Sequence, residues 1–246
     1  MSAEQAAPRR IVISGGTSGI GLACAERLAA AGDRVWVLGS SPATVARAAG
    51  RLALAGSGAC DVTDAAAVDA ALDQAAGELG GLDGVFVNAG IDGQGLPAAD
   101  LDLAQFRRVL DVNVIGAYLV ARAALRHLSR PGAIVFNASV SGLRPEPNFL
   151  DYNTSKAAVA MMAKSFALEL SAEGVCVTAL CPGYFPTRMT AGYLADEATR
   201  TEILRHIPAG RVGELTEIAA VVDFLLSPGA AYMTGSIVSV DGGSSI

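Results

Sequence analysis

Apolar runs rich in β-branched residues alternate with alanine- and leucine-rich stretches, and this alternation limits the fold more than any other feature. We expect strands over 10–14, 34–38, 84–87, 133–137, 175–180 and 237–240, with a short one ending at Cys60. We expect helices over 19–31, 43–54, 64–79, 103–128, 152–171 and 216–226, the third capped by Thr63 or Asp64. Most strands are apolar on both faces, which is typical of a parallel sheet covered by helices on both sides. The sequence therefore predicts an α/β fold of Rossmann type: one doubly wound domain with a seven-stranded parallel sheet.

No linker, repeat or low-complexity segment divides the 246 residues. We expect a mobile N-terminal leader over 1–9 and one dinucleotide-binding and catalytic domain over 10–246. The long irregular stretch from Pro182 to Gly213 is interpreted as a substrate lid, at about 183–213, because binding segments commonly lie on loops held by a rigid scaffold.

Composition excludes several classes of protein. A hydrophobic share of 52% argues against disorder, and no apolar run is long enough to span a membrane. A net charge of −6 argues against nucleic acid as a partner, since binding phosphates needs surplus basic charge. The N-terminus lacks a secretory h-region, and Cys24, Cys60, Cys176 and Cys181 form no Cys-x-x-Cys pair; both features predict a cytoplasmic protein with reduced, buried thiols. His127 and His206 stand far apart, so neither a metal site nor a Ser-His-Asp triad is expected.

A glycine-rich turn directly follows the first expected strand and opens the first helix. It runs Ser14-Gly15-Gly16-Thr17-Ser18-Gly19-Ile20-Gly21. Glycines in this position let the backbone approach a diphosphate, whose charge is stabilised by the helix N-terminus. No Gly-Lys-Ser/Thr follows, so the turn predicts a dinucleotide site rather than an ATP-type phosphate loop.

The spacing Gly-x3-Gly-x-Gly resembles that of the short-chain dehydrogenase/reductases, and further family motifs follow in order over residues 10–243. They are Asp61 after the third strand, Asn88-Ala89-Gly90 after the fourth, Asn113 with Gly116, Ser139, Tyr152-x-x-x-Lys156, Pro182-Gly183 with Thr187, Thr234-Gly235 and Asp241-Gly242-Gly243. Ser14 replaces the family threonine, and Val87 replaces the first asparagine of the Asn-Asn-Ala-Gly motif. The resemblance is to the 3-oxoacyl-[acyl-carrier-protein] reductase-like branch.

Tyr152 and Lys156 lie four residues apart on an expected helix, so both project from one face. An adjacent ammonium favours the phenolate, which makes Tyr152 a candidate general acid or base. The resemblance implies that Ser139 holds the substrate oxygen, that Lys156 also binds the nicotinamide ribose, and that Asn113 holds a relay water. The expected cofactor-binding residues are Ser14, Gly15, Thr17, Ser18, Gly19, Ile20, Gly21, Gly39, Ser40, Ser41, Asp61, Val62, Asn88, Ala89, Gly90, Tyr152, Lys156, Pro182, Gly183 and Thr187.

The end of the second strand bears on the choice between NAD(H) and NADP(H), because a carboxylate there binds the adenosine ribose and repels a 2′-phosphate. Gly39, Ser40 and Ser41 supply no carboxylate, which favours NADP(H). Ser18 and Ser40 supply no basic side chain either, so NAD(H) remains an alternative.

The expected substrate is a small ketone or secondary alcohol. Its pocket is expected from Val140, Arg144, Asn148, Phe149, Tyr184, Phe185 and Met189. Arg107, Arg108, Arg122 and Arg126 form a partial basic patch for docking a carrier protein. The leading hypothesis is an NADP(H)-dependent oxidoreductase; the alternatives are an NAD-dependent dehydrogenase of a polyol, sugar or cyclic alcohol, and a non-catalytic dinucleotide sensor. The resemblance further implies a homotetramer or homodimer.

Overall fold

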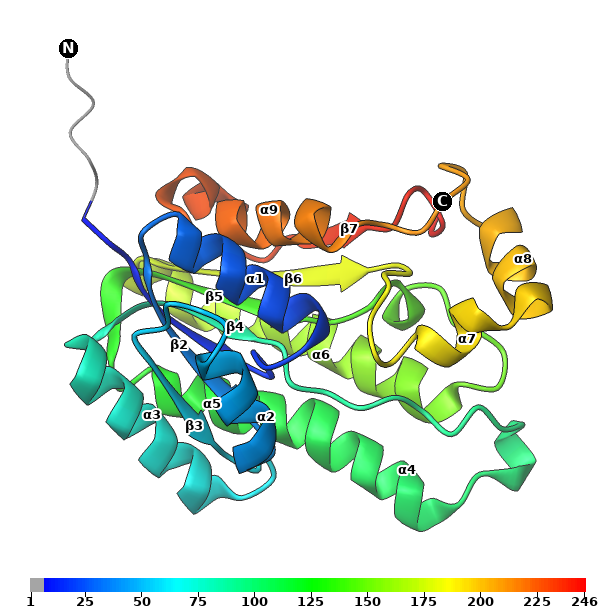
Figure 1. Ribbon diagram of the computed structural model, residues 1–246, viewed down its shortest axis with the longest axis horizontal. Coiled ribbons are helices and arrows are strands. Elements are labelled where there is room, and N and C mark those ends of the chain that lie inside the picture. Colours follow the sequence, from blue (N-terminus) through cyan, green and yellow to red (C-terminus); the bar gives the residue numbers. More distant parts are fainter. Residues whose placement is uncertain (1–6) are drawn as a thin grey trace.

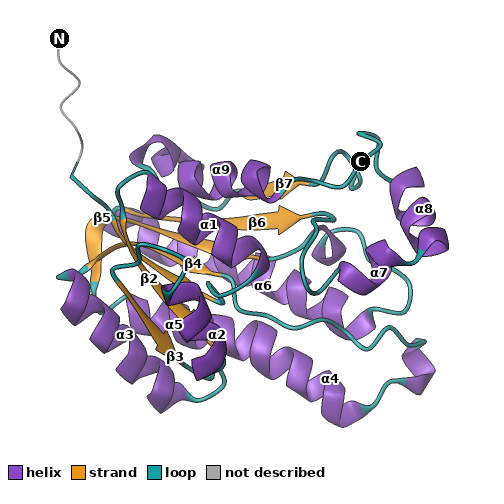
Figure 2. Ribbon diagram, in the orientation of Figure 1, coloured by secondary structure: helices purple, strands orange, loops and turns teal. Residues whose placement is uncertain are grey.

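Seven parallel strands form the central sheet of the computed structural model, which describes residues 7–246 (Figures 1 and 2). Their order is β3-β2-β1-β4-β5-β6-β7. Strands β2 and β3 lie on one side of β1 and strands β4 to β7 on the other, so the order of strands reverses between β1 and β4. In sheets of this kind ligands bind at the carboxyl ends of the strands, at that switch point. The predicted fold class is confirmed. The strands are β1 (Arg10–Ser14), β2 (Arg34–Gly39), β3 (Gly56–Ala59), β4 (Leu82–Val87), β5 (Leu128–Asn137), β6 (Val175–Pro182) and β7 (Ile237–Val240).

Helices cover both faces of the sheet (Figure 1). Alternate residues of one strand enter different cores: Ile11 and Ile13 pack with α1 (Gly19–Ala30) and α9 (Leu215–Leu225), whereas Val12 belongs to the core under α3 (Ala65–Leu79), α5 (Gly116–Ala124) and α6 (Leu150–Leu170). Burial on both faces explains the continuous apolar strands. The remaining helices are α2 (Pro42–Ala49), α4 (Leu103–Leu110), α7 (Ala191–Ala195), α8 (Glu197–Arg205) and the short turns Ala98–Asp100, Val140–Gly142, Ser171–Glu173 and Pro228–Met233.

The helix expected over 103–128 is wrong as one regular element. Between α4 and α5 the segment Asp111–Ile115 is π-helical, and Leu128 already belongs to β5, where it pairs with Leu82. Extra residues of this kind inside a helix often occur at functional sites. This one contains Asn113, whose side chain bonds the backbone of Ile91.

Other boundaries differ less. The helix expected over 43–54 ends at Ala49, and the segment expected to be irregular after Pro182 contains α7 and α8. Of the two candidate caps of α3, Asp64 accepts hydrogen bonds from the amides of Ala66 and Ala67.

The expected leader divides into two parts. Residues 1–6 lie outside the described residues. Arg9 belongs to the folded domain, because its guanidinium lies 2.5 Å from Asp33 and 2.7 Å from Asp223. The four cysteines are buried and free, as expected. Within residues 7–246 no helix has the length and apolar character of a membrane span, and no three potential metal ligands lie together.

Candidate active site

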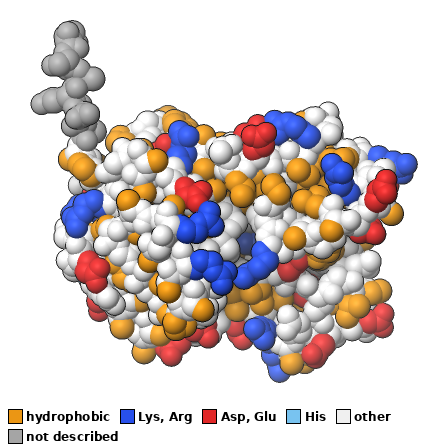
Figure 3. All heavy atoms as spheres, viewed as in Figure 1, with side chains coloured by type: hydrophobic (Ala, Val, Ile, Leu, Met, Phe, Trp, Pro, Cys, Tyr) orange, Lys and Arg blue, Asp and Glu red, His pale blue; other side chains and the backbone are white. Residues whose placement is uncertain are grey.

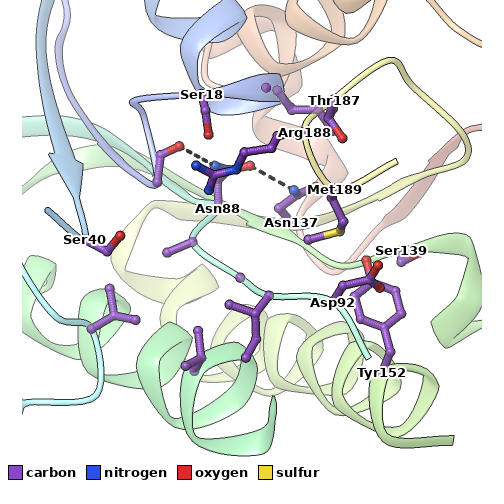
Figure 4. Close-up of a pocket in the computed structure, with 18 of the residues that line it drawn as sticks. Ser18, Ser40, Asn88, Asp92, Asn137, Ser139, Tyr152, Thr187, Arg188 and Met189 are labelled. Carbon is purple, nitrogen blue, oxygen red and sulfur yellow. Dashed lines mark hydrogen bonds between the residues drawn. The ribbon is translucent and has the colours of Figure 1, made fainter. Parts of the chain in front are cut away.

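A cavity of about 760 Å³ opens at the carboxyl ends of the central strands. Figure 3 shows this face hollowed near its centre, with Lys or Arg side chains around the hollow. Figure 4 shows Ser18 and Ser40 toward one end of the cavity, and Asp92, Ser139 and Tyr152 together at the other. The cavity is therefore long, with the expected phosphate-binding turn and the expected catalytic residues in one continuous space.

Hydrogen bonds tie the glycine-rich turn to the end of β4. The Ser14 hydroxyl accepts from the amides of Asn88 at 2.9 Å and Ala89 at 3.2 Å. The Asn88 amide group donates to the carbonyls of Ser14 and Gly15, both at 3.1 Å. Gly21 is needed for this packing, because a Cβ there would lie 2.4 Å from the Gly15 carbonyl oxygen. The turn is thus fixed before any ligand binds.

The N-terminus of α1 leaves donors free for an anion. Ser18 is its N-cap residue but makes no capping hydrogen bond with its side chain. The first amides of a helix lack intrahelical acceptors, and the helix dipole favours negative charge beside them. Thr187, which follows β6, lies against the same turn, since a Cβ at Gly19 would lie 3.3 Å from it. Arg188, from the segment after β6, extends across the cavity above Asn88 (Figure 4).

The end of β2 has little room for a side chain at its last residue. A Cβ at Gly39 would lie 2.6 Å from Thr17 Cγ2 and 3.0 Å from Val45 Cγ2. Ser40 lines the cavity, whereas Ser41 caps α2 through Thr44. A carboxylate side chain at position 39 would therefore overlap Thr17 unless Thr17 moved.

Asp61 lies at the same end of the cavity. Its carboxylate accepts from the Thr63 amide at 2.9 Å and hydroxyl at 2.8 Å. These bonds, with a smaller contribution from Arg108, lower the pKa of Asp61. Arg108 itself lines the cavity.

The catalytic candidates lie on three elements that meet at the other end. The Lys156 ammonium donates to the Asn137 carbonyl at 2.8 Å and lies 5.6 Å from the centre of the Tyr152 ring. Ser139 follows β5 and donates to Ser141 at 3.2 Å. Asn113 holds the Ile91 amide at 2.8 Å and donates to Ser155 at 3.0 Å. A Cβ at Gly90 would lie 3.2 Å from Asn113 and 3.5 Å from Lys156, so these two residues flank the same glycine.

Burial changes the proton affinities of this pair in opposite directions. It lowers the pKa of Lys156 from 10.5 to about 8, since the residue is only 4% exposed. Burial also raises the pKa of Tyr152, as do the charges of Asp92 and Glu146, while Ser139 acts in the opposite direction. Tyr152 is consequently a phenol at neutral pH and holds a proton that can be donated.

A smaller cavity of about 70 Å³ adjoins Tyr152 and Ser139. Of the expected substrate residues, Val140, Phe149, Tyr184 and Met189 line it, and Phe185 lines the larger cavity. Arg144 and Asn148 line neither: Arg144 donates to the Ser244 carbonyl at 2.7 Å, and Asn148 is exposed, with a φ of 65°. Both residues are exposed and lie outside the two cavities, so the geometry gives no support for their part in a substrate pocket.

The larger cavity contains most of the expected cofactor residues. Ser14, Gly21 and Ser41 do not line it, because they support the turn and α2 from behind. The expected cofactor and catalytic residues that line it are Gly15, Thr17, Ser18, Gly19, Ile20, Gly39, Ser40, Asp61, Val62, Asn88, Ala89, Gly90, Ser139, Tyr152, Lys156, Pro182, Gly183 and Thr187.

Sequence reasoning missed Asn137 and Asp92. Asn137 donates to Asn88 at 2.9 Å and its carbonyl holds Lys156, which links the turn to the catalytic helix (Figure 4). Its Oδ1 is buried without a hydrogen-bond partner in the described chain, so the residue offers a free acceptor beside the cavity. The available signals were weak: Asn137 ends an apolar strand, and Asp92 follows Gly90 by two residues.

The proposed basic docking patch is not supported. Arg122 lies 3.0 Å from Asp69, and Arg126 lies 2.9 Å from both Asp69 and Asp73. Their charges are thus balanced by α3, and Arg108 lines the cavity instead.

The geometry fits a dinucleotide: a fixed glycine turn, an uncapped helix N-terminus and an unpartnered buried acceptor share one elongated cavity. A family model described as enoyl-(acyl carrier protein) reductase matches residues 15–245. The chain belongs to the short-chain dehydrogenase/reductase family and is an oxidoreductase of alcohols or ketones. This family binds NAD(H) or NADP(H).

Three similar proteins illustrate the range of relatives. The chain is 39% identical to a cis-4-hydroxycyclohexanecarboxylate dehydrogenase of Sinomonas cyclohexanicum, over 98% of each chain. It is 41% identical to a galactitol 2-dehydrogenase of Rhizobium johnstonii, over 95% of this chain and 94% of the relative. The solved structure of a 3-ketoacyl-(acyl-carrier-protein) reductase from Brucella melitensis, complexed with NADH, superposes with a TM-score of 0.90 at 32% identity and covers 96% of this chain and 98% of that one.

Proposed function

We propose that the protein interconverts a ketone and a secondary alcohol with NADP(H), using Tyr152 as the general acid and base. The observation that carries the proposal is the juxtaposition of Tyr152, Ser139 and Lys156 at one end of a cavity whose other end is a phosphate-binding turn. The cofactor, when bound, supplies or accepts the hydride.

The chain's own residues supply the proton and the orientation. Tyr152 donates its phenolic proton to the carbonyl oxygen in reduction and removes the hydroxyl proton in oxidation. The Ser139 hydroxyl holds the same oxygen. Lys156 lies close enough to Tyr152 to stabilise the phenolate that reduction leaves behind, and the Asn137 carbonyl fixes its ammonium. Asn113 holds the π-helical segment against Ile91 beside Lys156, where a proton relay to solvent would run.

Replacing Tyr152 by phenylalanine tests the chemical role. We expect Tyr152→Phe to lower kcat by about 10²–10⁴-fold, the usual contribution of a general acid, while the dissociation constant of the cofactor stays within about threefold. Tyr232→Phe is the matched control, because Tyr232 is fully exposed. The assay is nicotinamide absorbance on whichever of a broad panel of ketones and alcohols the wild type turns over. Equal turnover by Tyr152→Phe and wild type contradicts the mechanism.

The preference for NADP(H) rests on the end of β2. No carboxylate stands at positions 39–41, Thr17 fills the space beside Gly39, and the Ser40 hydroxyl lines the cavity. NAD(H) is the second candidate, because neither Ser18 nor Ser40 carries a positive charge and the similar Brucella melitensis structure is described as an NADH complex. A comparison of kcat/KM for NADPH and NADH on one ketone separates the two; a preference for NADH overturns the first.

A homotetramer or homodimer in the cytoplasm completes the proposal. Met161 and Leu168 stand seven residues apart on α6 and are 60% and 83% exposed, and Tyr118 of α5 is 43% exposed. Large apolar side chains at this spacing form one helix face suited to a partner subunit. Light scattering coupled to size-exclusion chromatography measures the mass; a monomer contradicts this part. The four free, buried cysteines suit a reducing compartment.

A further inference from the structure

Two tyrosine–carboxylate pairs form much of the smaller cavity beside Tyr152. The Tyr193 hydroxyl donates to Asp92 at 2.7 Å, and the Tyr184 hydroxyl donates to Glu146 at 2.7 Å. These four residues come from separate segments: after β4, before α6, after β6 and in α7. All four line the cavity together with Ser139 and Tyr152. A substrate whose reacting carbon lies at Tyr152 therefore extends between the two pairs.

Each carboxylate is fixed but retains capacity for further hydrogen bonds. Asp92 Oδ1 accepts from the Gly93 amide at 2.9 Å, and Glu146 Oε1 accepts weakly from the Ser141 hydroxyl at 3.4 Å. A carboxylate has about four lone-pair positions, so both groups can accept additional hydrogen bonds from a ligand. Hydroxyl groups are the donors that suit such acceptors.

The charge of this cavity is negative. Its lining, taken over the described residues, includes Asp92 and Glu146 but no Lys, Arg or His. Lys156 and Arg188 line the adjoining larger cavity, and Arg144 is bound to the Ser244 carbonyl outside both. Burial and these carboxylates raise the pKa of Tyr184 and of Tyr193, so both tyrosines remain uncharged donors. An anionic substituent inside the smaller cavity would therefore meet two carboxylates and no cation of the lining, which is unfavourable in a partly buried site.

We propose that this cavity selects an uncharged polyhydroxylated substrate, such as a polyol or a hydroxylated cyclic alcohol or its ketone, and excludes substrates with a carboxylate or phosphate near the reacting carbon. Asp92 and Glu146 accept the substrate's additional hydroxyls, and Tyr184 and Tyr193 hold the carboxylates in place. The inference rests on the proposed oxidoreductase function and assigns its substrate class.

The test compares compounds that share one secondary alcohol and differ in the rest: an uncharged polyol, the same skeleton ending in a carboxylate, and the skeleton without the extra hydroxyls. We expect wild-type kcat/KM for the polyol to exceed that for the carboxylate by about 100-fold or more, because buried hydrogen-bonding sites discriminate strongly. Glu146→Gln removes one charge while keeping the side-chain length, and we expect it to reduce that ratio by about tenfold. Glu169→Gln removes an exposed carboxylate near the end of α6 that lines neither cavity, and it should leave the ratio unchanged.

Two outcomes overturn the substrate assignment: a wild-type preference for the carboxylate or for the skeleton without hydroxyls, or an unchanged ratio in Glu146→Gln with normal cofactor affinity. The second would mean that the Tyr184–Glu146 pair only fastens the segment after β6 to the segment before α6. Should Glu146→Gln fail to fold, as judged by cofactor binding and thermal unfolding, Asp92→Asn provides the same comparison. Failure of the proposed function is distinguishable, because it gives no Tyr152-dependent turnover of any compound in the broad panel, whereas failure of the substrate assignment alone leaves Tyr152-dependent turnover of other ketones or alcohols.

Discussion

Replacing Lys156 by methionine should make the cofactor-free protein more stable at neutral pH. Lys156 is 4% exposed, and burial lowers the pKa of its ammonium from 10.5 to about 8. A tenfold change in proton affinity corresponds to about 1.4 kcal/mol, so carrying the charge in the fold costs about 3 kcal/mol at pH 7. The bond to the Asn137 carbonyl returns about 1 kcal/mol, which the variant loses. The expected net gain for Lys156→Met is therefore about 2 kcal/mol.

The gain must depend on pH with a definite sign. A lysine whose pKa is lowered by folding binds fewer protons in the folded than in the unfolded state between pH 8 and 10.5. Wild-type stability therefore rises through that range. The advantage of Lys156→Met falls accordingly and is close to zero near pH 10. At pH 7 the gain of about 2 kcal/mol corresponds to a rise in Tm of about 4–8 °C for a chain of this size.

Thermal unfolding of the cofactor-free proteins at one protein concentration, at pH 7 and pH 10, measures both quantities. Lys164→Met is the matched control, because Lys164 is the only other lysine, lies on the same helix and is exposed. We expect it to change Tm by little at either pH. A Lys156→Met protein that is no more stable than wild type at pH 7, or whose advantage is the same at pH 10, would refute the assignment of a buried, charged lysine. We expect the same variant to lose most of its turnover. Lys156 would then lower the folding stability of the protein while being required for its activity.

Two further predictions concern the cofactor end of the cavity. Gly21→Ala should lower stability by about 1–3 kcal/mol and weaken cofactor binding, because its Cβ would lie 2.4 Å from the Gly15 carbonyl oxygen. Gly77→Ala is the control: this glycine lies in a helix, a Cβ there would meet nothing within 4 Å, and the variant should raise stability by about 0.5–1 kcal/mol. Thermal unfolding and a fluorescence titration with cofactor measure both, and a Gly21→Ala protein that binds cofactor normally contradicts the close approach. Ser40→Arg should tighten NADP(H) binding by about tenfold through a charge-assisted bond to the 2′-phosphate, while Ser40→Asp should shift preference toward NAD(H); equal Kd ratios in both variants would show that Ser40 does not face this part of the cofactor.

Lys156 also shows which parts of the site can be predicted from sequence. Tyr152 and Lys156 share one helix, so their spacing alone places them on one face. The glycine turn likewise follows directly from a strand and opens a helix, and the structure finds it lining the cavity. In contrast, Asn137 acts through Asn88, 49 residues away, and Asp92 acts through Tyr193, 101 residues away. No local pattern identifies partners at such separations.

The arginines give the opposite example. Arg122 and Arg126 have the spacing of a basic helix face, and by that criterion they formed a docking patch. In the fold, α3 places Asp69 and Asp73 against them, so the charges of these two arginines are balanced. The regular helix expected over 103–128 was wrong for a similar reason, because Asn113 forms its hydrogen bonds with Ile91 and Ser155 from elsewhere in the chain.

The sequence by itself determined the strand and helix alternation, the phosphate-binding turn and the tyrosine–lysine pair, because each depends on residues that are near neighbours along the chain. Only the tertiary structure decided the lowered pKa of Lys156, the bracing role of Asn137 and the negative charge of the substrate cavity. These properties depend on burial and on through-space partners. Asp92, Glu146, Tyr184 and Tyr193 come from segments far apart in the sequence, and only the fold brings them together.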